Sequence, residues 1–414
     1  MKRFLVIGHV WPEPKTTAAG NRMLQLLKAF TRKNFDIIFA STASKTGYSH
    51  NLKKIGIVEE NIQLNDSSFD HFIRELQPDL VLFDRFMVEE QFGWRVAKNC
   101  PKAVRILNTE DLHSLREHRG MCLKKNMDWT SFHWLEQDKT KREIASIYRS
   151  DLSLLVSSFE MELVQKILNI DEELLLHLPF MLPRIGSQQV SKWPKFSDRK
   201  AYISYGNGLH DPNLDSFVHL KQVIWPLIRK IQPRAILHIY GAYLPSHIKQ
   251  LHEPKEGFLV LGWVEDLSKE VQNARVVLAP LRFGAGIKGK LALAMQNGTP
   301  TITTSKGAEG MSTSGIWPGA VKNETKDFVE QAVQLYQNEE KWYQAQEEGI
   351  NIVNTIFNEE HLSKLLFDRV ETLAQNLENH RQKNFIGSLL QHQSMAAKKY
   401  MGKWIEEKNR NPRK

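Results

Sequence analysis

Residues 282–300 read RFGAGIKGKLALAMQNGTP, a glycine-rich segment that runs into an apolar helical pattern. Gly284, Gly286 and Gly289 have the G-x-G-x-x-G spacing of dinucleotide-binding loops. Such glycines directly follow the first strand of their domain, whereas here LRFG separates them from a late strand, ARVVLAP. The spacing alone is a weak signal, and its position disfavours a nicotinamide or flavin site.

The same segment is suited to binding a phosphate. Small residues let the backbone approach a ligand closely, and the NH groups of a helix that we expect to begin near Ile287 would point at an anion. Lys288 and Lys290 add two positive charges at this end, where cations are unfavourable for the helix itself. A bound anion would explain their placement. The alternative is that both lysines are exposed and have no role.

Around this segment the chain alternates short apolar strands with helices, in two successive series. The first series contains the strands KRFLVIGHV, FDIIFAST, PDLVLFDRF, AVRILNTEDLH, DLSLLVSS and LLLHLPFML, and the second runs from AYISYG to PTITTS. This alternation is typical of doubly wound parallel sheets. We therefore predict an α/β chain with Rossmann-like domains at residues 1–190 and 198–375, whose ligand lies between them at the carboxyl ends of the strands.

Composition and charge narrow the class of protein. The 414 residues are 41% hydrophobic, and no apolar run has the length of a membrane span or resembles a signal peptide. The only cysteines, Cys100 and Cys122, exclude a disulfide framework, so we expect a cytoplasmic protein. Residues 376–414 form a basic tail with nine Lys or Arg against three acids. This tail could meet an anionic membrane, nucleic acid or a phosphorylated substrate, or it could be a solvated helix or pack back on the first domain.

Longer stretches of the chain resemble one known family. In the second half these are GNGLHDPNLDSF, IWPLI, LHIYGA, LGWVEDL and VVLAPLRFGAGIKGKLALAMQNGTPTITTSKGAEGM. They closely resemble the carboxyl-terminal domain of bacterial family 4 glycosyltransferases. In the first half WPEPKTTAAGNRMLQLL, TEDLHSLRE and SFEMELVQK fit more loosely, so the similarity covers roughly residues 1–370.

The resemblance implies the GT-B fold, in which two Rossmann-like domains face each other across a cleft. It also implies an enzyme that transfers a sugar from a nucleotide-diphosphate-sugar donor to an acceptor hydroxyl, with retention of configuration and without a metal or another cofactor. The acceptor would be a glycan, a lipid-linked glycan or a small molecule. The sequence contains no Asp-x-Asp motif that could hold a divalent cation on a diphosphate. Lysines and helix NH groups would then stabilise the leaving diphosphate.

One position departs from the family pattern. The family usually has a glutamate in E-A-M-A-x-G-x-P that binds the donor ribose, and the matching residue here is Leu293. The partner position eight residues earlier is Ala285. Glu309 in GAEGM could take over the ribose contact. Alternatively the donor differs from the family's usual one. The chain could also be a non-catalytic nucleotide- or partner-binding protein of the same fold, which is the second hypothesis of function. A nicotinamide oxidoreductase is the third.

The resemblance and the predicted strand ends together give a set of candidate site residues. The donor-side candidates are Gly206, Asn207, Gly208, Gly284, Gly286, Lys288, Lys290, Glu309 and Gly310. The acceptor-side candidates are His9, Trp11, Glu110, Asp111, Arg116 and Arg119. Lys288 and His113 are the proposed catalytic residues.

Most candidates of the first domain also have a structural interpretation. A neutral His113 imidazole could donate to a sugar hydroxyl or assist proton movement, or it could form a structural hydrogen bond. Arg116 and Arg119 could fork an anionic acceptor, or they could pair with Glu110, Asp111 and Glu117 in a surface network. Trp11 could stack on a sugar ring or only pack its loop.

Overall fold

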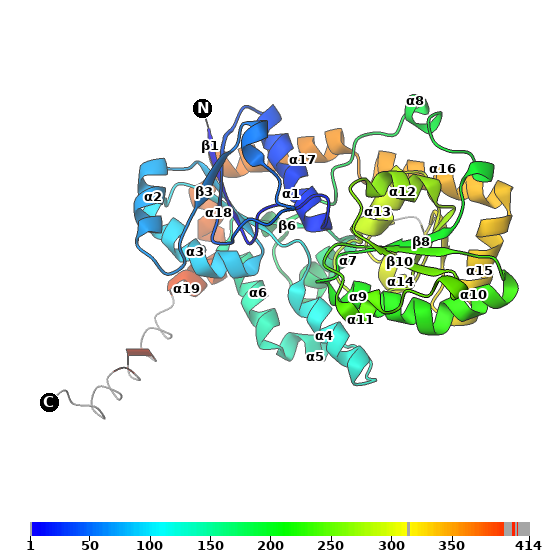
Figure 1. The fold of residues 1–414 in the computed structure, drawn as a ribbon. Coiled ribbons are helices and arrows are strands. Elements are labelled where there is room, and N and C mark those ends of the chain that lie inside the picture. The colour runs from blue at the N-terminus through cyan, green and yellow to red at the C-terminus, as the bar shows by residue number, and fades with distance from the viewer. Residues whose placement is uncertain (1, 313–314, 393–399, 402–403, 405–414) are drawn as a thin grey trace.

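The structure is a computed structural model that describes residues 2–312, 315–392, 400, 401 and 404. Two parallel sheets lie in two lobes, each covered by helices (Figure 1). The strand orders are β3-β2-β1-β4-β5-β6-β7 and β10-β9-β8-β11-β12-β13. This confirms the prediction of two Rossmann-like domains.

The first sheet has seven strands: β1 (Arg3–Gly8), β2 (Asp36–Ser41), β3 (Val58–Asn61), β4 (Leu80–Asp84), β5 (Val104–Asn108), β6 (Leu152–Leu155) and β7 (Leu175–His177). The helices around it are α1 (Ala18–Arg32), α2 (Ser68–Leu76), α3 (Phe86–Asn99), α4 (His113–Lys124), α5 (Ser131–Glu136), α6 (Asp138–Arg149) and α7 (Ser158–Glu162). Every residue of β4 and β5 is buried, because helices cover both faces of a parallel sheet.

The second sheet has six strands: β8 (Tyr202–Tyr205), β9 (Leu237–Tyr240), β10 (Phe258–Gly262), β11 (Val276–Ala279), β12 (Thr301–Thr303) and β13 (Gly319–Val321). The longer helices around it are α9 (Asp211–His219), α10 (Trp225–Ile231), α12 (Leu267–Asn273), α13 (Gly289–Gln296), α15 (Thr325–Gln337) and α16 (Glu339–Thr355). The short α11 (Ser246–Lys249) and α14 (Ser305–Ala308) complete this unit.

The polar segment 183–200, whose composition is typical of an unstructured linker between domains, is structured. It contains the short helix α8 (Ser187–Val190), and its Trp193 side chain is buried. Arg199 is fully buried and donates from Nη1 to Thr299 Oγ1 at 2.7 Å. These contacts attach the connection to the second domain.

The expected end of the second domain at residue 375 is wrong. Helix α17 (Glu359–Gln375) returns to the first lobe, where it is drawn in orange in Figure 1. Its apolar face joins the core of the first domain, and the rings of Phe367 and Phe30 meet at 4.9 Å. The helical periodicity predicts such a face but does not say which sheet it covers.

The described part of the basic tail also packs on the first domain. Helices α18 (Leu377–Lys383) and α19 (Phe385–His392) follow α17, and Arg381 forms an ion pair with Asp151 at 2.7 Å. Asn384 Nδ2 donates to the Tyr148 carbonyl at 2.7 Å. Most of residues 393–414 lie outside the described residues. No helix in the described part is both long and apolar enough to span a bilayer.

Candidate functional site

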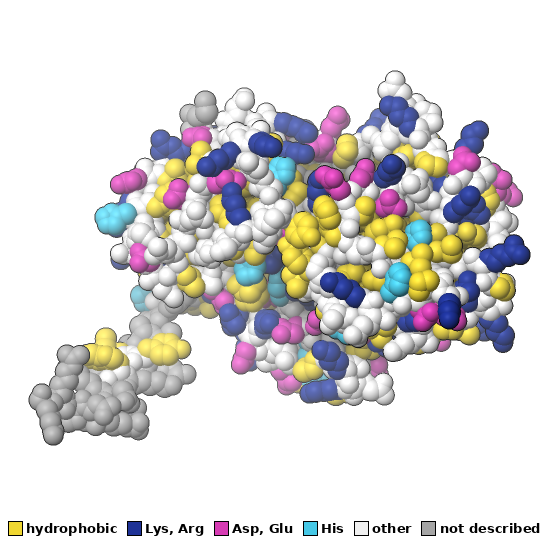
Figure 2. Space-filling model, in the orientation of Figure 1, with side chains coloured by type: hydrophobic (Ala, Val, Ile, Leu, Met, Phe, Trp, Pro, Cys, Tyr) yellow, Lys and Arg dark blue, Asp and Glu magenta, His cyan; other side chains and the backbone are white. Residues whose placement is uncertain are grey.

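A cavity of about 700 Å³ separates the two domains at the carboxyl ends of their strands. The loops after β1, β4 and β5 line it from the first domain, and those after β8, β9 and β11 line it from the second. In each sheet the strand order reverses at β1/β4 or β8/β11, the position where such folds bind ligands. Figure 2, in the orientation of Figure 1, shows apolar side chains where the two domains meet. Val10, Leu209 and Trp263 line the cavity and stay exposed.

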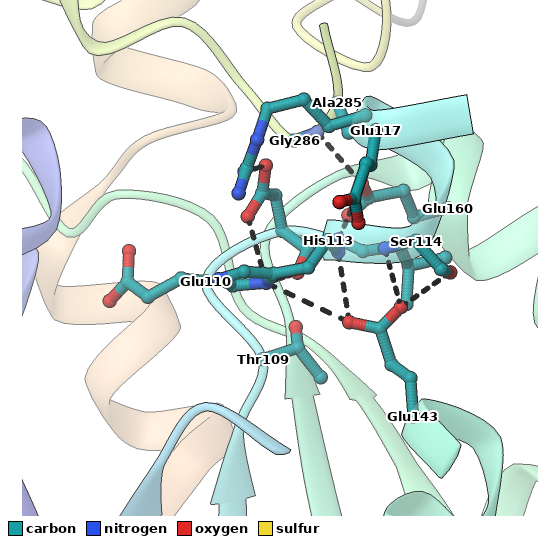
Figure 3. Close-up of polar contacts among 12 residues, drawn as sticks. Thr109, Glu110, His113, Ser114, Glu117, Glu143, Glu160, Ala285 and Gly286 are labelled. Carbon is teal, nitrogen blue, oxygen red and sulfur yellow. Dashed lines mark hydrogen bonds and ion pairs between the residues drawn. The ribbon is translucent and has the colours of Figure 1, made fainter. Parts of the chain in front are cut away.

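The glycine loop after β11 contacts the first domain directly. Gly286 has φ 62°, and a Cβ there would lie 2.8 Å from the Asp111 Cβ. Its NH donates to Glu160 Oε1 at 2.7 Å, a contact visible in Figure 3. Glycine at this position therefore lets the loop turn and lets the two domains approach each other.

Lys288 lies at the N-terminus of α13 and lines the cavity. The helix begins at Gly289 rather than near Ile287, so Lys288 is its N-cap residue. The Lys288 Nζ donates to the carbonyls of Gly286 at 2.7 Å and Ala285 at 3.3 Å. Burial, opposed by the charges of Glu309 and Glu160, lowers its pKa to about 8.

Lys290, in the first turn of the same helix, has a buried and unpartnered ammonium group. Its Nζ lies 5.8 Å from the centre of the Phe217 ring, and it has no hydrogen-bond partner among the described residues. Burial, together with the charge of Lys288, lowers the pKa of Lys290 to about 7. A buried cation without a partner is unfavourable for the fold, so Lys290 is available to an anion.

This burial predicts a pH-dependent effect of Lys290→Met on stability. The lysine has a pKa of about 7 in the folded chain and about 10.4 in the unfolded chain. The charged form therefore destabilises the folded state below pH 7, and this penalty disappears as the pH rises toward 10. We expect Lys290→Met to raise the free energy of unfolding by at least ~1 kcal/mol at pH 6.5 and not at pH 10. Urea unfolding at both pH values measures this, and an equal gain at both would contradict the assignment.

Both glycine NH groups in the loop after β8, a donor-side candidate segment, are engaged within the second domain. The Gly206 NH donates to the Tyr240 carbonyl at 3.0 Å, and the Gly208 NH donates to the Ala242 carbonyl at 2.8 Å. Asn207 contacts the other domain, because its Nδ2 donates to the Thr16 carbonyl at 3.3 Å. Gly206 and Asn207 line the cavity, but charge for a ligand at this end must come from Lys288 and Lys290.

His113 is the first residue of α4 rather than part of a loop. Glu143 caps this helix: it accepts from the His113 NH at 2.8 Å and from the Ser114 NH and hydroxyl (Figure 3). The His113 Nδ1 lies 3.2 Å from an Asp111 carboxylate oxygen. Burial, opposed by the Glu143 charge, nevertheless lowers the pKa of His113. A neutral imidazole on the cavity wall can exchange hydrogen bonds with a ligand hydroxyl.

The other polar candidates of the first domain form three separate pairs. Arg116 forms an ion pair with Asp111, and both line the cavity. Glu110 accepts from Asn108 Nδ2 at 2.8 Å, and burial raises its pKa. The His9 backbone NH donates to an Asp84 carboxylate oxygen at 3.3 Å.

Trp11 packs its loop. The indole is 2% exposed, and its Nε1 donates to the Ala43 carbonyl at 2.7 Å. Its ring lies 5.4 Å from that of Phe39 in the core. The structure therefore supports the packing interpretation over stacking on a sugar ring.

Arg119 connects the two domains. Its guanidinium donates to both Glu309 oxygens, at 2.6 and 3.0 Å, and to the Gly284 carbonyl at 2.9 Å. Beside this pair, Gly310 has φ 74°, and a Cβ there would lie 2.1 Å from Ser157 Oγ of the first domain. Arg119, Glu309 and Gly310 do not line the cavity. They hold the glycine loop against the first domain, a role that the sequence did not suggest.

Sequence reasoning missed Glu160. The residue is fully buried in α7, and it accepts from the NH groups of Leu112 and Gly286 through the same oxygen. Its other oxygen has no partner among the described residues, and burial raises its pKa to about 7. A carboxylate shared by two domains has no signal in a single sequence.

Sequence reasoning also missed Arg85. This residue follows β4, lines the cavity and has φ 75° and ψ 156°, a backbone region that is almost specific to glycine. Holding a side chain there costs about 1–3 kcal/mol. The available signal was a charged residue near the end of the predicted strand PDLVLFDRF.

No group of three or more His, Cys, Asp or Glu side chains could hold a metal ion within the part of the chain that the structure describes. The acidic side chains that line the cavity are individually engaged with protein partners, as Asp111 is with Arg116. The charged groups at the start of α13 are cationic.

Comparison with known proteins agrees with this geometry. Residues 201–338 match the family described as glycosyl transferases group 1. No curated protein gives a significant match. The matched range spans β8 to α15, including the glycine loop and both lysines, and the match supports a transferase enzyme.

Solved structures share the fold over nearly the whole chain. A TarM variant of S. aureus, in complex with fondaparinux, alpha-GlcNAc-glycerol and UDP, has a TM-score of 0.68 at 10% identity and covers 89% of this chain and 99% of its own. HepE of Anabaena, in complex with UDP and glucose, gives 0.67 at 12% identity over 90% and 100%. Sucrose-phosphate synthase of Thermosynechococcus elongatus gives 0.64 at 12% identity over 90% and 99%. At this identity the likeness establishes the GT-B fold.

Proposed function

We propose that this chain is a retaining glycosyltransferase of the family 4 type, which moves a sugar from a nucleotide-diphosphate sugar to an acceptor hydroxyl without a metal. The observation that carries the proposal is the pair Lys288 and Lys290 at the start of α13, on the wall of the cleft between the domains. The group 1 match over residues 201–338 and the UDP complexes of HepE and TarM support it.

In this proposal the donor diphosphate occupies the start of α13. Departure of the nucleoside diphosphate leaves negative charge on its terminal phosphate, and two ammonium groups with the helix NH groups neutralise it. The Lys288 ammonium now donates to the Gly286 and Ala285 carbonyls, and phosphate oxygens would accept from it instead. An anion beside Lys290 would also raise its lowered pKa and keep it charged.

The acceptor side of the proposal rests on His113. Its imidazole lines the cavity opposite the lysines, next to Asp111. A neutral ring held in this way could orient a sugar hydroxyl or carry a proton between acceptor and leaving group.

Leu293 favours a second candidate function, that of a non-catalytic nucleotide-binding protein. Leu293 lines the cavity where the family carries its ribose-binding glutamate, and Ala285 lines it at the partner position. Glu309 is held by Arg119 at 2.6 Å and by Lys306 at 3.2 Å, so a ribose would have to compete with two cations for it. Under the enzyme proposal the donor ribose is held by other groups of the cavity.

A panel of nucleotide sugars tests the proposal and separates the two candidates. We expect one of UDP-, GDP- or dTDP-sugars to raise the melting temperature and to be hydrolysed or transferred in EDTA as fast as in MgCl₂. A melting shift without turnover would favour the non-catalytic candidate. No shift with any of the three classes would contradict both, and NADH titration then examines the oxidoreductase alternative.

We further propose that the protein acts in the cytoplasm and meets an anionic membrane surface through its carboxyl-terminal segment. The described helix α19 leaves Phe385, Ile386 and Leu389 exposed at 68%, 50% and 56%. The basic residues that follow in the sequence would add attraction to anionic lipids. Nucleic acid is the less favoured partner, because apolar contacts are not needed for phosphate backbone binding.

A further inference from the structure

Arg85 adds a further positive charge to the wall of the cavity. The other arginine that lines the cavity is engaged, because Arg116 pairs with Asp111. Among the described residues the Arg85 guanidinium forms no ion pair and no hydrogen bond, and its Nε atom is buried without a partner. The side chain thus lines the cavity with its donors free.

The Asp84 and Glu110 carboxylates face the same cavity, and the charge of Arg85 acts on one of them, because burial raises the pKa of Glu110 and this charge partly opposes the rise. Asp84 accepts from the His9 NH at 3.3 Å, and Glu110 accepts from Asn108 at 2.8 Å, but neither forms an ion pair with the guanidinium. The charge of Arg85 also acts on His9. The pKa of His9 is lowered mainly by burial and, as the second cause, by this charge.

The strained backbone conformation at Arg85 is a second, independent indication of a ligand site. Its φ of 75° and ψ of 156° suit glycine, yet the NH is held by the Asn108 carbonyl at 2.8 Å, and the carbonyl accepts from Val88 at 3.1 Å. Such strained residues cluster at ligand sites, where the surrounding structure maintains them. Here the strain holds a large cationic side chain at the entrance of α3, whose N-terminus also favours an anion.

We propose that Arg85 binds a carboxylate or phosphate group of the acceptor, so that the acceptor is an anionic sugar or sugar phosphate rather than a neutral glycan. This inference rests on the proposed function, which places the donor against Lys288 and Lys290 of the second domain. Arg85 belongs to the first domain, and its planar fork matches an oxyanion with two parallel hydrogen bonds.

The test compares matched sugars by calorimetric titration of wild-type protein and Arg85→Gln, with and without saturating UDP. Methyl glucuronide and glucose 6-phosphate serve as anionic probes, methyl glucoside as the neutral probe, and inorganic phosphate as the minimal probe. We expect wild-type protein to bind at least one anionic probe about tenfold or more tightly than methyl glucoside. Arg85→Gln should remove this preference and leave the affinity for UDP unchanged.

Two further variants serve as controls. Arg142→Gln removes a surface arginine, paired with Glu90, that does not line the cavity, and it should keep the preference. Arg85→Gly removes the side chain but accepts the backbone, so it should melt no lower than wild type while losing the preference. This separates loss of a binding group from loss of fold.

Three results would overturn the inference. The first is that wild-type protein binds no anionic probe more tightly than Arg85→Gln does. The second is that Arg85→Gln keeps the preference and loses affinity for UDP, which would assign Arg85 to the donor diphosphate. The third is that Arg85→Gly unfolds at a clearly lower temperature, which would make the side chain structural. Failure of UDP and the other nucleotides to bind would count against the proposed function alone, because the sugar titrations without nucleotide still report on Arg85.

Discussion

Replacing Lys288 with alanine should lower kcat/KM for the nucleotide-sugar donor by about a hundredfold or more. The loss should fall mainly on kcat, because the ammonium is needed most when the diphosphate departs and its charge grows. Lys288 lies at the N-terminus of α13 with its Nζ 2.7 Å from the Gly286 carbonyl, inside the cavity between the domains. At a protected position like this, a cation stabilises developing charge more strongly than it would in water.

Steady-state kinetics of Lys288→Ala and Lys288→Met measure this effect. Methionine fills much of the same volume, so comparison of the two variants separates the lost charge from a collapsed loop. Lys326→Ala is the matched control, because Lys326 is an exposed lysine in the first turn of α15 in the same domain. Unchanged turnover in both Lys288 variants would remove the assigned role and leave the family match without a mechanism.

A rise in pH should not mimic this loss until Lys288 itself deprotonates in the complex. The lysine pKa is lowered to about 8 in the free protein by burial, against the charges of Glu309 and Glu160. A bound diphosphate favours the charged form and raises the pKa again. Donor binding is therefore coupled to proton uptake by Lys288.

Much of the donor side could be predicted from local sequence. Lys288 and Lys290 follow a late strand and lie at the start of a helix. In such sheets the carboxyl ends of the strands border the ligand cleft, so this local pattern is enough to place both lysines there. The two-residue error in the start of α13 came from the loop glycines, which allow either a turn or a first helical residue.

The contacts between the domains could not be predicted in the same way. Arg119 looked like an acceptor-binding residue three positions from Arg116 on one helix, but its partner Glu309 is 190 residues away. Glu160 and Gly286 are 126 residues apart. Which charged residue meets which depends on how the two lobes pack, and periodicity within one helix carries no information about it.

Replacing Arg119 with methionine should lower the free energy of unfolding by about 3–5 kcal/mol, the usual cost of breaking a buried ion pair from one side. The Arg119 and Glu309 side chains are only 3% and 11% exposed. The Arg119 guanidinium also lies over the rings of Trp129 and Phe159, 5.1 and 5.0 Å from their centres. The variant would leave Glu309 with Lys306 alone and free the Gly284 carbonyl.

The double variant Arg119→Met/Glu309→Gln tests whether the loss comes from the unpaired carboxylate. It should recover part of the stability, and a double-mutant cycle measured by urea unfolding gives the coupling between the two side chains. The pair Arg142 and Glu90 provides the comparison: it has a similar two-bond geometry, at 2.9 and 2.6 Å, but Arg142 is 54% exposed. Arg142→Met should therefore cost less than about 1 kcal/mol.

The same ion pair should make stability fall in acid. Burial raises the pKa of Glu309, but hydrogen bonds and charge from Arg119, with Lys306 and Lys288, outweigh it and hold the pKa below the usual value. The stabilising contribution is thus present above the unfolded-state pKa of about 4.3 and is lost as pH falls through the lowered folded-state value. In Arg119→Met this acid-dependent part should shrink. Equal acid sensitivity of the two proteins, or a loss no larger than that of Arg142→Met, would show that the domains are held together elsewhere, for example by Glu160 and Gly286.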